Sequence, residues 1–223
     1  NTSNDYVNYH AVELLRDIEP WGVPIAGGRI QSSNPDSDAI YIHGDASGVL
    51  AGAYIGAQIT SGRVINTNGG GIIISGLGSP DGGMDVATWM PDNTEIIAAG
   101  GSIKIIADSI NNLDAVIGGT DAAHTATFIL EPRTPGTSMG LGSGSGELSL
   151  SNLNLQYLSN LILGGSVEDG PIASDIDVAG INSLPTLTLY GTGTATLNGI
   201  LTLNGDLSVN AAAINIGSAG ATN

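Results

Sequence analysis

Short segments in which apolar and polar residues alternate follow one another closely over residues 184–217. Five triplets have an apolar residue on either side of a polar one: Leu187-Thr188-Leu189, Ala195-Thr196-Leu197, Leu201-Thr202-Leu203, Leu207-Ser208-Val209 and Ile214-Asn215-Ile216. Alternation with a period of two is typical of a β-strand with one buried and one water-exposed face. Gly or Asn follows each triplet within two residues and favours a sharp turn.

The spacing of these triplets predicts how the strands are connected. They begin at positions 187, 195, 201, 207 and 214, in steps of 8, 6, 6 and 7 residues. Such steps are too short for hairpins, whose strands run about 5–6 residues before the turn. Three steps from 187 to 207 span 20 residues, which predicts three short strands per coil, each stacked on the strand one coil earlier. The predicted fold class is therefore all-β, a parallel β-helix, in which Leu189, Leu203, Val209 and Ile216 point inward.

The strand pattern begins after Pro24, so we predict a β-helix over residues 25–223. The Gly-Gly units at 70–74 and 100–105 look like one element repeated about 30 residues later. We expect a loop insertion near 78–92 and an irregular corner near 151–160. At about 20–23 residues per coil, the part after Pro24 would form about nine coils.

Residues 1–24 have a different pattern. Val7, Leu14 and Ile18 recur at helical spacing, and Pro20 and Pro24 would end a helix, so we predict a short amphipathic N-terminal helix. Two roles stay open for this segment: a cap on the open end of the β-helix, or a docking element for a neighbouring subunit or domain.

Composition narrows the function classes. The chain has 5 Lys and Arg residues against 21 Asp and Glu residues, and its formal charge of −16 argues against binding to nucleic acid or to an anionic membrane surface. It has no cysteine, which excludes disulfides and cysteine metal sites. No apolar run reaches the roughly 18 residues of a membrane-spanning helix. No signal peptide opens the sequence, so we expect a mature, processed chain or a piece of a longer one.

The order of several segments carries a family resemblance. These are FILEPRT at 128–134, MGLG at 139–142, GELSL at 146–150, residues 153–158, NLILG at 160–164 and IDV at 176–178. The series resembles the repeat of very large filamentous haemagglutinin-like exoproteins of Gram-negative bacteria. Residues 66–76 and 97–108 resemble their shorter Gly-Gly-x-Ile-x-Ile units.

The resemblance covers roughly residues 60–217 and implies both fold and function. It implies a right-handed β-helix, exported by two-partner or autotransporter secretion, that serves as the shaft of an adhesin or a surface fibre. The expected location is extracellular or on the cell surface, and cell-surface or matrix polysaccharide is an expected partner. The family's amino-terminal secretion domain is missing here, so both an internal segment of a giant exoprotein and a dedicated filament subunit stay open.

An enzyme is the first alternative, because some parallel β-helices cleave acidic polysaccharides. That chemistry needs paired carboxylates or Ca²⁺, together with Arg and Lys to hold uronates. The candidate carboxylates are Asp36, Asp38, Asp45, Asp81, Asp85, Asp175 and Asp177. Asp175 and Asp177 flank Ile176 and are expected to point outward, where surface charge keeps a sheet soluble.

Other residue types offer little support for catalysis. The basic residues are dispersed along the chain: Arg16, Arg29, Arg63, Lys104 and Arg133. His10, His43 and His124 are too far apart in sequence to suggest a metal cluster. The sequence therefore predicts no enzyme, no metal and no cofactor.

A second alternative is binding of ice or crystalline polysaccharide by a flat array of threonines. The clustered threonines are Thr186, Thr188, Thr192, Thr194, Thr196 and Thr202. Thr188, Thr196 and Thr202 belong to successive predicted strands and hence to different faces. Because Thr also favours exposed strand positions in general, we prefer that simpler explanation.

Assembly with other copies or with further repeats is the interaction that we expect. A β-helix ends in unpaired strand edges, which pair with another chain unless they are capped. We expect end-to-end stacking in which Val7, Leu14 and Ile18 at one end meet Ile214 and Ile216 at the other.

Overall fold

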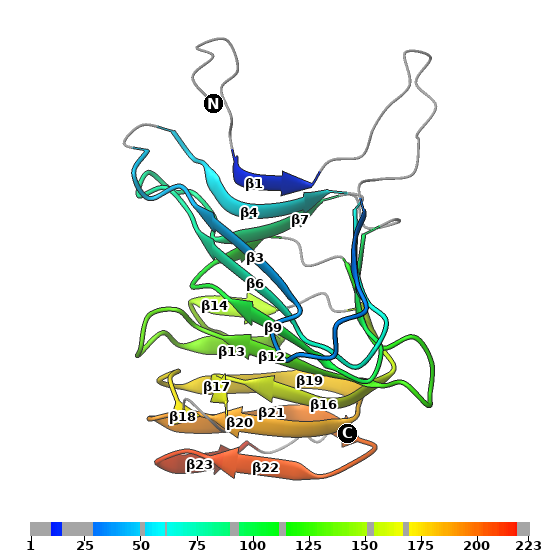
Figure 1. Ribbon diagram of the computed structural model, residues 1–223. Helices are drawn as coiled ribbons and strands as arrows, with labels where there is room; N and C mark the ends of the chain where they lie inside the picture. Colours follow the sequence, from blue (N-terminus) through cyan, green and yellow to red (C-terminus); the bar gives the residue numbers. More distant parts are fainter. Residues whose placement is uncertain are drawn as a thin grey trace.

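The structure is a computed structural model, and it describes residues 10–14, 29–49, 52–60, 62–89, 94–111, 115–150, 154–166 and 170–217. Within these ranges the fold is all-β and contains no helix. The strands are parallel in four sheets, and one small antiparallel pair joins β17 (Gly165–Ser166) to β18 (Gly170–Pro171). Figure 1 shows the strands piled on one another from β1 at the top to β22 and β23 at the bottom.

One sheet runs through most of the pile, and we call it the long sheet. Its strands, in spatial order, are β3 (Ile40–Asp45), β6 (Ile72–Leu77), β9 (Ser102–Ile106), β12 (Ala126–Glu131), β16 (Leu158–Leu163), β20 (Thr186–Tyr190) and β22 (Leu207–Asn210).

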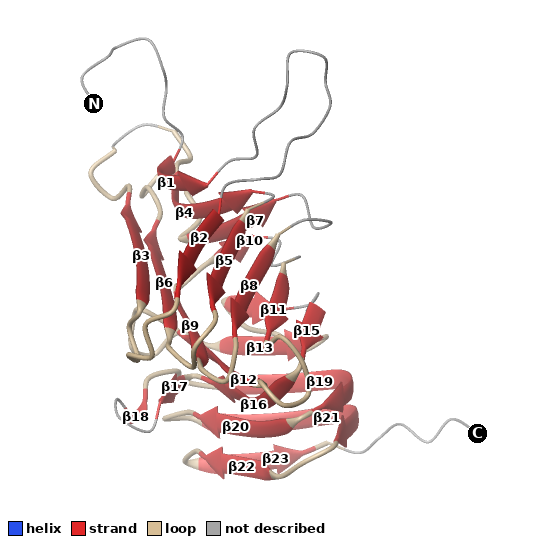
Figure 2. Cartoon of the chain, turned by 45° about the vertical axis from the view of Figure 1, so that its right-hand side comes forward, coloured by secondary structure: helices blue, strands red, loops and turns tan. Residues whose placement is uncertain are grey.

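Two further sheets accompany the first part of the long sheet. The upper sheet contains β1 (His10–Leu14), β4 (Ile55–Thr60), β7 (Val86–Trp89) and β10 (Ile110–Asn111). The side sheet, best seen in Figure 2, contains β2 (Arg29–Ser32), β5 (Arg63–Asn66), β8 (Glu95–Ala98), β11 (Val116–Gly118) and β15 (Asn154–Gln156). Up to β12 the chain visits the upper, side and long sheets in turn.

The lower sheet replaces the upper sheet from β13 onward. Its strands, in spatial order, are β14 (Leu148–Leu150), β13 (Met139–Gly142), β19 (Ile176–Leu184), β21 (Thr194–Leu203) and β23 (Ala213–Ile216). The two longest described strands, β19 and β21, lie in this sheet, and their mutual register shifts near Gly180. Gly180 and Gly199 both have positive φ, 63° and 69°, which bends the two strands at the same level.

The register of the long sheet tests the predicted period. The successive partners along it are Ile40, Ile72, Ile103, Phe128, Leu161, Leu187 and Leu207. The predicted stacking of position 207 on position 187 is confirmed, and the two Gly-Gly units, interpreted as one repeated element, pair with each other. The estimate of nine coils is too high for the described chain, because the earlier coils carry longer connections and the long sheet has seven described strands.

The core is the column of side chains that these partners stack inside the pile. Ile72, Ile103, Phe128, Leu161 and Leu187 are each 0% exposed. A second inward row holds Ile74, Ile105, Leu130, Leu163 and Leu189, all buried as well. Because the strands are parallel and in register, apolar side chains stack on apolar side chains, and one continuous apolar cluster runs through the chain.

The burial of the predicted core residues falls toward the last coil. Leu189 is buried, whereas Leu203 and Val209 are partly buried against the core. Ile216 was expected to point inward and is 76% exposed. It pairs with the buried Leu197 and so continues an inward row, but no described strand lies beyond β23 to cover it.

The predicted N-terminal helix is wrong where the structure describes that segment. His10–Leu14 is strand β1, parallel to β4, with Val12 opposite Ala57 and Leu14 opposite Ile59. The sequence of this segment is compatible with both a helical and a strand period. The backbone hydrogen bonds that the free edge of β4 offers stabilise it as a strand. The other residues of the predicted helix lie outside the described ranges.

The two predicted irregular segments contain strands. Residues 78–85 connect β6 to β7 as a loop, but the predicted insertion near 78–92 also includes β7 itself. Residues 151–160 include β15 and the start of β16, and Tyr157 between them has a φ of 50°. A positive φ at a non-glycine residue turns the chain sharply from the side sheet into the long sheet.

Candidate functional site

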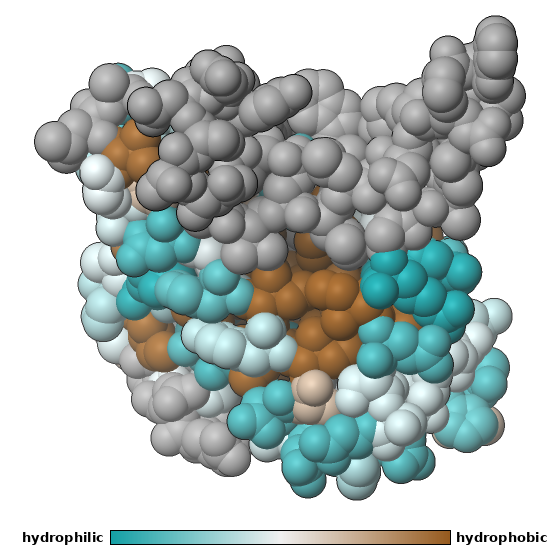
Figure 3. Space-filling model, turned by 45° about the horizontal axis from the view of Figure 1, so that its top comes forward, coloured by the Kyte–Doolittle hydropathy of each residue, from teal (hydrophilic) through white to brown (hydrophobic). Residues whose placement is uncertain are grey.

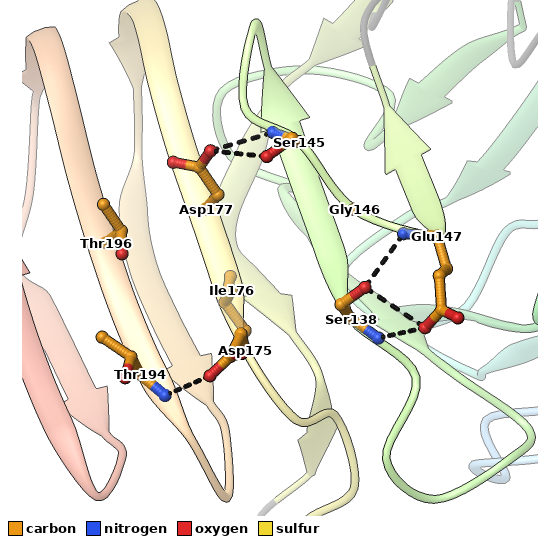
Figure 4. A pocket seen from close by; sticks show the side chains of 9 residues that line it. All are labelled: Ser138, Ser145, Gly146, Glu147, Asp175, Ile176, Asp177, Thr194 and Thr196. Atoms are coloured by element: carbon orange, nitrogen blue, oxygen red, sulfur yellow. Dashed lines mark hydrogen bonds between the residues drawn. The ribbon is translucent and has the colours of Figure 1, made fainter.

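A polar groove of about 680 Å³ lies on the outer face of the lower sheet. Its lining residues are Ser138, Ser145, Gly146, Glu147, Asp175, Ile176, Asp177, Thr194 and Thr196. Figure 4 shows that they come from adjacent strands and from the loop between β13 and β14. Three carboxylates and four hydroxyl groups thus line the same space.

The register of the lower sheet explains this gathering. Met139, Ile176 and Ala195 are partners and point inward, at 1%, 1% and 0% exposure. The residues on either side of them must point outward because side chains alternate along a strand. Asp177 therefore lies beside Thr196, and Asp175 lies one position before Ile176 on the same face.

The loop between β13 and β14 closes one side of the groove. A Cβ at Gly140, Gly144 or Gly146 would overlap backbone atoms of this loop, of β13 or of Asp177, so the loop folds back over β13 without space for side chains. This fold-back brings Ser145 and Glu147 to the groove.

Hydrogen bonds hold all three carboxylates in place. Asp175 Oδ1 accepts from the Thr194 amide at 2.6 Å, and Asp177 Oδ2 accepts from the Ser145 amide at 2.9 Å. Glu147 Oε2 accepts from the Ser138 amide at 3.0 Å. Each carboxylate thus bonds a backbone amide of another segment, which fastens neighbouring strands and loops together (Figure 4).

Sequence reasoning found only part of this groove. The outward orientation of Asp175 and Asp177 was predicted from their alternation around Ile176, and the structure confirms it. Ser138, Ser145 and Glu147 were missed because a short return loop brings them there. The alternating glycines at 140, 142, 144 and 146 were the available signal for such a loop.

The other candidate carboxylates lie apart from the groove. Asp85 is 5% exposed and accepts from the amides of Gly78 at 2.7 Å and Asp108 at 2.6 Å. Asp81 accepts from the Gly52 amide at 3.1 Å. Asp36 accepts from the Asn34 side chain at 3.0 Å. Each of these three stabilises a turn or a corner, and none lines the groove with Asp175 and Asp177.

Asp45 is another of the candidate carboxylates, and its side chain is exposed. A hydrogen bond from the Ser47 hydroxyl at 2.6 Å, followed by one from the Ser47 amide, lowers the pKa of Asp45 below its ordinary value. Asp38 is exposed in the turn before β3. Neither residue is among those that line the groove.

The described cations are mostly engaged within the chain. Arg63 pairs with Glu95, Lys104 Nζ lies 2.8 Å from Glu131 Oε2, and Arg133 donates to Ser75 Oγ at 2.7 Å. None of these residues lines the polar groove. The groove therefore has an acidic character, which disfavours uronates and sulfated sugars.

Among the described residues, no cluster of three or more His, Asp or Glu side chains has the arrangement of a metal site. His43 stacks on Tyr41, and His124 Nδ1 lies 2.9 Å from Asp121 Oδ1 in an exposed turn. The side chain of His10 lies outside the description.

The clustered threonines do not form one row. Thr196 lies between Asp177 and Asn215 in the lower sheet. Thr188 lies between Ile162 and Ser208 in the long sheet. A flat array needs threonines stacked coil after coil, and these registers place other residue types above and below each of them.

A second, smaller pocket of about 300 Å³ lies on the outer face of the long sheet. Ile73, Ile129 and Ile162 give it an apolar floor, and its other lining residues are Ser37, Ser102, Lys104 and Ser166. Figure 3 shows that apolar side chains gather in the middle of one described surface, with polar side chains on both sides. The ion pair of Lys104 with Glu131 neutralises the cation of this pocket.

The predicted assembly residues lie at opposite ends of the pile where they are described. Leu14 belongs to β1, and Ile214 and Ile216 belong to β23 (Figure 1). Ile214 is 54% exposed. Val7 and Ile18 lie outside the described ranges.

No protein-family model, curated protein or solved structure matches this chain. A search of the described part for a helix with the length and apolarity to cross a bilayer found none.

Proposed function

We propose that this chain is a structural segment of an extracellular fibre or filamentous adhesin, built as a right-handed parallel β-helix. The supporting observation is the long sheet, in which seven described parallel strands stack their apolar residues in one column. Such a column stabilises an elongated body through apolar burial. The right hand is supported by the strong general preference of parallel β-crossovers.

The use of the polar residues supports a structural role over catalysis. Asp85, Asp175, Asp177 and Glu147 all accept hydrogen bonds from backbone amides. A general acid or base needs to exchange its proton with a substrate, whereas these carboxylates fasten coils and loops. We therefore propose that the chain is not an enzyme and that it does not depolymerise pectin, alginate or glycosaminoglycans.

The location is the part of the proposal that an experiment can test directly. An antiserum against the purified protein, detected with immunogold on intact cells of the encoding organism, is expected to label material on the cell surface. Permeabilised cells serve as the control for total antigen. Labelling that appears only after permeabilisation would contradict the proposal.

The polar groove favours a second candidate function, binding of a neutral polysaccharide. Its volume of about 680 Å³ is in the range of small-ligand sites. Carboxylates accept hydrogen bonds from sugar hydroxyls, and the hydroxyls of Thr194 and Thr196 can both donate and accept. The acidic lining selects against uronic acids.

Calorimetric titration with neutral and uronic oligosaccharides tests this second candidate. We expect binding of neutral chains only, weakened by Thr196→Val, which removes the hydroxyl but keeps the shape. Asp36→Asn, outside the set of groove residues, is the matched surface control. Equal affinity of the wild-type protein and the Thr196 variant would exclude this groove as the site.

A further inference from the structure

The outer face of the long sheet carries an apolar row in its middle, where the exposed face of a sheet is usually polar. Each member of the row lies between two buried core residues of its own strand and therefore points outward. The members are consecutive partners on β6, β9, β12 and β16: Ile73, Lys104, Ile129 and Ile162. They form the floor of the pocket of about 300 Å³, which we call the outer groove.

Lys104 contributes apolar surface to this floor because its charge is drawn aside. Its Nζ lies 2.8 Å from Oε2 of Glu131, the last residue of β12. The methylene stem of Lys104 therefore lies in the row between Ile73 and Ile129, while the amine is held toward the C-terminal end of the neighbouring strand. The side chains of Lys104 and Glu131 are 19% and 8% exposed, so this pair of opposite charges is largely withdrawn from water.

Two segments border the outer groove on opposite sides. At the N-terminal ends of the strands, a Cβ at Gly71 would lie 1.8 Å from the Ser37 carbonyl oxygen and 3.2 Å from Ser102 Oγ, so the glycine lets the loop before β3 approach closely. At the C-terminal ends, Ser166 lies in the β17–β18 pair that follows β16. The outer groove thus runs across the strands, with serines at its borders.

The length of the apolar row is limited at both ends. The outward partner of Ile73 is Tyr41, and the outward partner of Ile162 is Thr188. From Ile73 to Ile162 the floor crosses three strand spacings, each of about 4.8 Å, which gives a length of about 14 Å. A zigzag hydrocarbon with bonds of about 1.5 Å advances about 1.25 Å per bond, so a chain of about ten carbons spans this floor.

The size and the lining of the outer groove narrow the class of ligand. A stable protein interface buries about 800 Å² on each partner, far more than a floor of one side chain on each of four strands provides. A sugar buried against isoleucine would leave hydroxyl groups without hydrogen-bond partners, which is costly. A flexible linear hydrocarbon meets neither difficulty.

We propose that the outer groove binds a single linear alkyl chain of about ten carbons that carries an uncharged polar head. An anionic head would compete with Glu131 for Lys104 and leave the buried Glu131 carboxylate without its cation. A cationic head would be repelled by Lys104. The serine hydroxyls at the borders can donate to an uncharged head and accept from it. This site goes beyond the proposed fibre function and is separate from the polar groove.

A titration of the full chain with straight-chain alcohols, followed by NMR of labelled isoleucine methyl groups, tests the site. We expect 1-decanol to shift the methyl signals of Ile73, Ile129 and Ile162. The methyl signals of Ile200, which is 67% exposed on β21, should stay in place. From 1-hexanol through 1-octanol to 1-decanol, the affinity should rise about twofold to fourfold per added methylene, because each one buries further apolar surface.

The charge of the head is tested with decanoate. Decanoate should bind at least about tenfold more weakly than 1-decanol, because an ionised head adds the cost of disturbing the Lys104–Glu131 pair. Glu131→Gln removes the carboxylate beside Lys104 and should narrow this preference. Equal affinities of decanoate and 1-decanol for the wild-type protein would overturn the assignment of an uncharged head.

A variant pair separates this site from general hydrophobic adsorption. Ile129→Asn places an amide in the floor and should weaken binding of 1-decanol at least about fivefold. Ile200→Asn makes the same change at an exposed position outside the outer groove and should leave the affinity unchanged. Circular dichroism establishes that both variants are folded.

Three results with the wild-type protein alone would overturn the proposal, whatever the variants do. They are no shift at saturation with 1-decanol, shifts at Ile200 as large as those at Ile129, or an affinity that does not depend on chain length. The immunogold experiment tests location only, so failure of this site and failure of the proposed fibre function are distinguishable.

Discussion

The coils above β13 and the coils below it build the same core column in two different ways. In the upper part each coil consists of three separate strands, and the long sheet is revisited only after a long path, as from Ile40 to Ile72. In the lower part the last path, from Leu187 to Leu207, is the shorter one, and a coil consists of one short strand and one long, bent strand. The buried residues are equivalent in both parts, so the extra residues of the upper coils serve the corners.

The corners explain the difference in length. In the upper part, buried polar side chains organise them: Asn66 is 0% exposed, donates to the Asn34 carbonyl and accepts from the amides of Asn68 and Gly70. In the lower part, Gly180 and Gly199 turn the strands through positive φ. A corner made by a side chain needs a loop around it, whereas a glycine corner needs a single residue.

The largest expected loss of unfolding free energy comes from a substitution in the middle of the core column, which we compare with a substitution at its end. Leu189→Ala, at a fully buried position, should cost about 3 kcal/mol of unfolding free energy, because it removes buried methyl groups and leaves a cavity. Ile216→Ala, at a 76% exposed position, should cost less than about 0.5 kcal/mol in the monomer. Urea unfolding at low protein concentration measures both. Equal losses would mean that a further coil covers Ile216.

A smaller effect distinguishes the two kinds of corner. Asn66→Ala should lower the unfolding free energy by about 2 kcal/mol, because it leaves the buried Gly70 amide without its acceptor. Asn198→Ala in the lower part removes one bond, to Asp177 at 3.2 Å from a partly exposed side chain, and should cost about 0.5 kcal/mol. The same urea experiment measures both variants. A cost at Asn66 no larger than that at Asn198 would contradict the proposed role of the upper corners.

Substitution of a glycine at a corner should cause an intermediate loss of stability. Gly199 has a φ of 69°, and a Cβ there would meet its nearest atom, the Gly180 amide nitrogen, at an ordinary 3.5 Å. The cost of Gly199→Ala therefore comes from the backbone alone and should be about 1 kcal/mol. Gly48→Ala, where no atom lies within 4 Å of a Cβ, is the control and should be neutral. Thermal unfolding of the two variants would contradict this explanation if their midpoints were the same.

The sequence predicted the period of the lower part better than that of the upper part, but the three short strands predicted per coil are two there, because the triplets at 195–197 and 201–203 lie in the single strand β21. The triplets from Leu187 to Ile216 recur at nearly constant steps, because glycine corners add few residues, and the period could be read directly. The earlier coils are unequal in length, as the steps between the partners Ile72, Ile103, Phe128 and Leu161 show, because the loops at their corners differ in length. Periodicity then gave the strands but not the number of coils.

The predictions made from the sequence were wrong where contacts between residues far apart in the chain determine the structure. The segment His10–Leu14 fits a helical and a strand period, and its pairing with β4 cannot be inferred from local pattern. The groove on the lower sheet depends on the return of the chain from β13 to β14, and only Asp175 and Asp177 could be predicted as outward residues. Burial at a given position also depends on the next coil, which is why Ile216 differs from Leu189.

The smallest expected effect concerns an exposed corner of the upper part, where β3 ends at Asp45. The Ser47 hydroxyl and amide hold the pKa of Asp45 below its ordinary value of 3.8. A depressed folded-state pKa stabilises the fold at pH values above 3.8, and this contribution is lost as the pH falls through the lower, folded-state pKa. Because Asp45 is fully exposed, solvent screens the interaction, in contrast to the buried corner at Asn66.

Ser47→Ala tests this contrast. It removes the hydroxyl but keeps the amide, so the pKa of Asp45 should rise part of the way toward 3.8, while the unfolding free energy at neutral pH stays unchanged within error. Carboxyl-carbon NMR titration measures the pKa. Asp121, whose pKa is lowered mainly by the hydrogen bond to His124, is the internal control and should not move. A clear loss of stability at neutral pH would show that the exposed corners hold the upper coils together as strongly as the buried ones do, and the distinction between them would have to be abandoned.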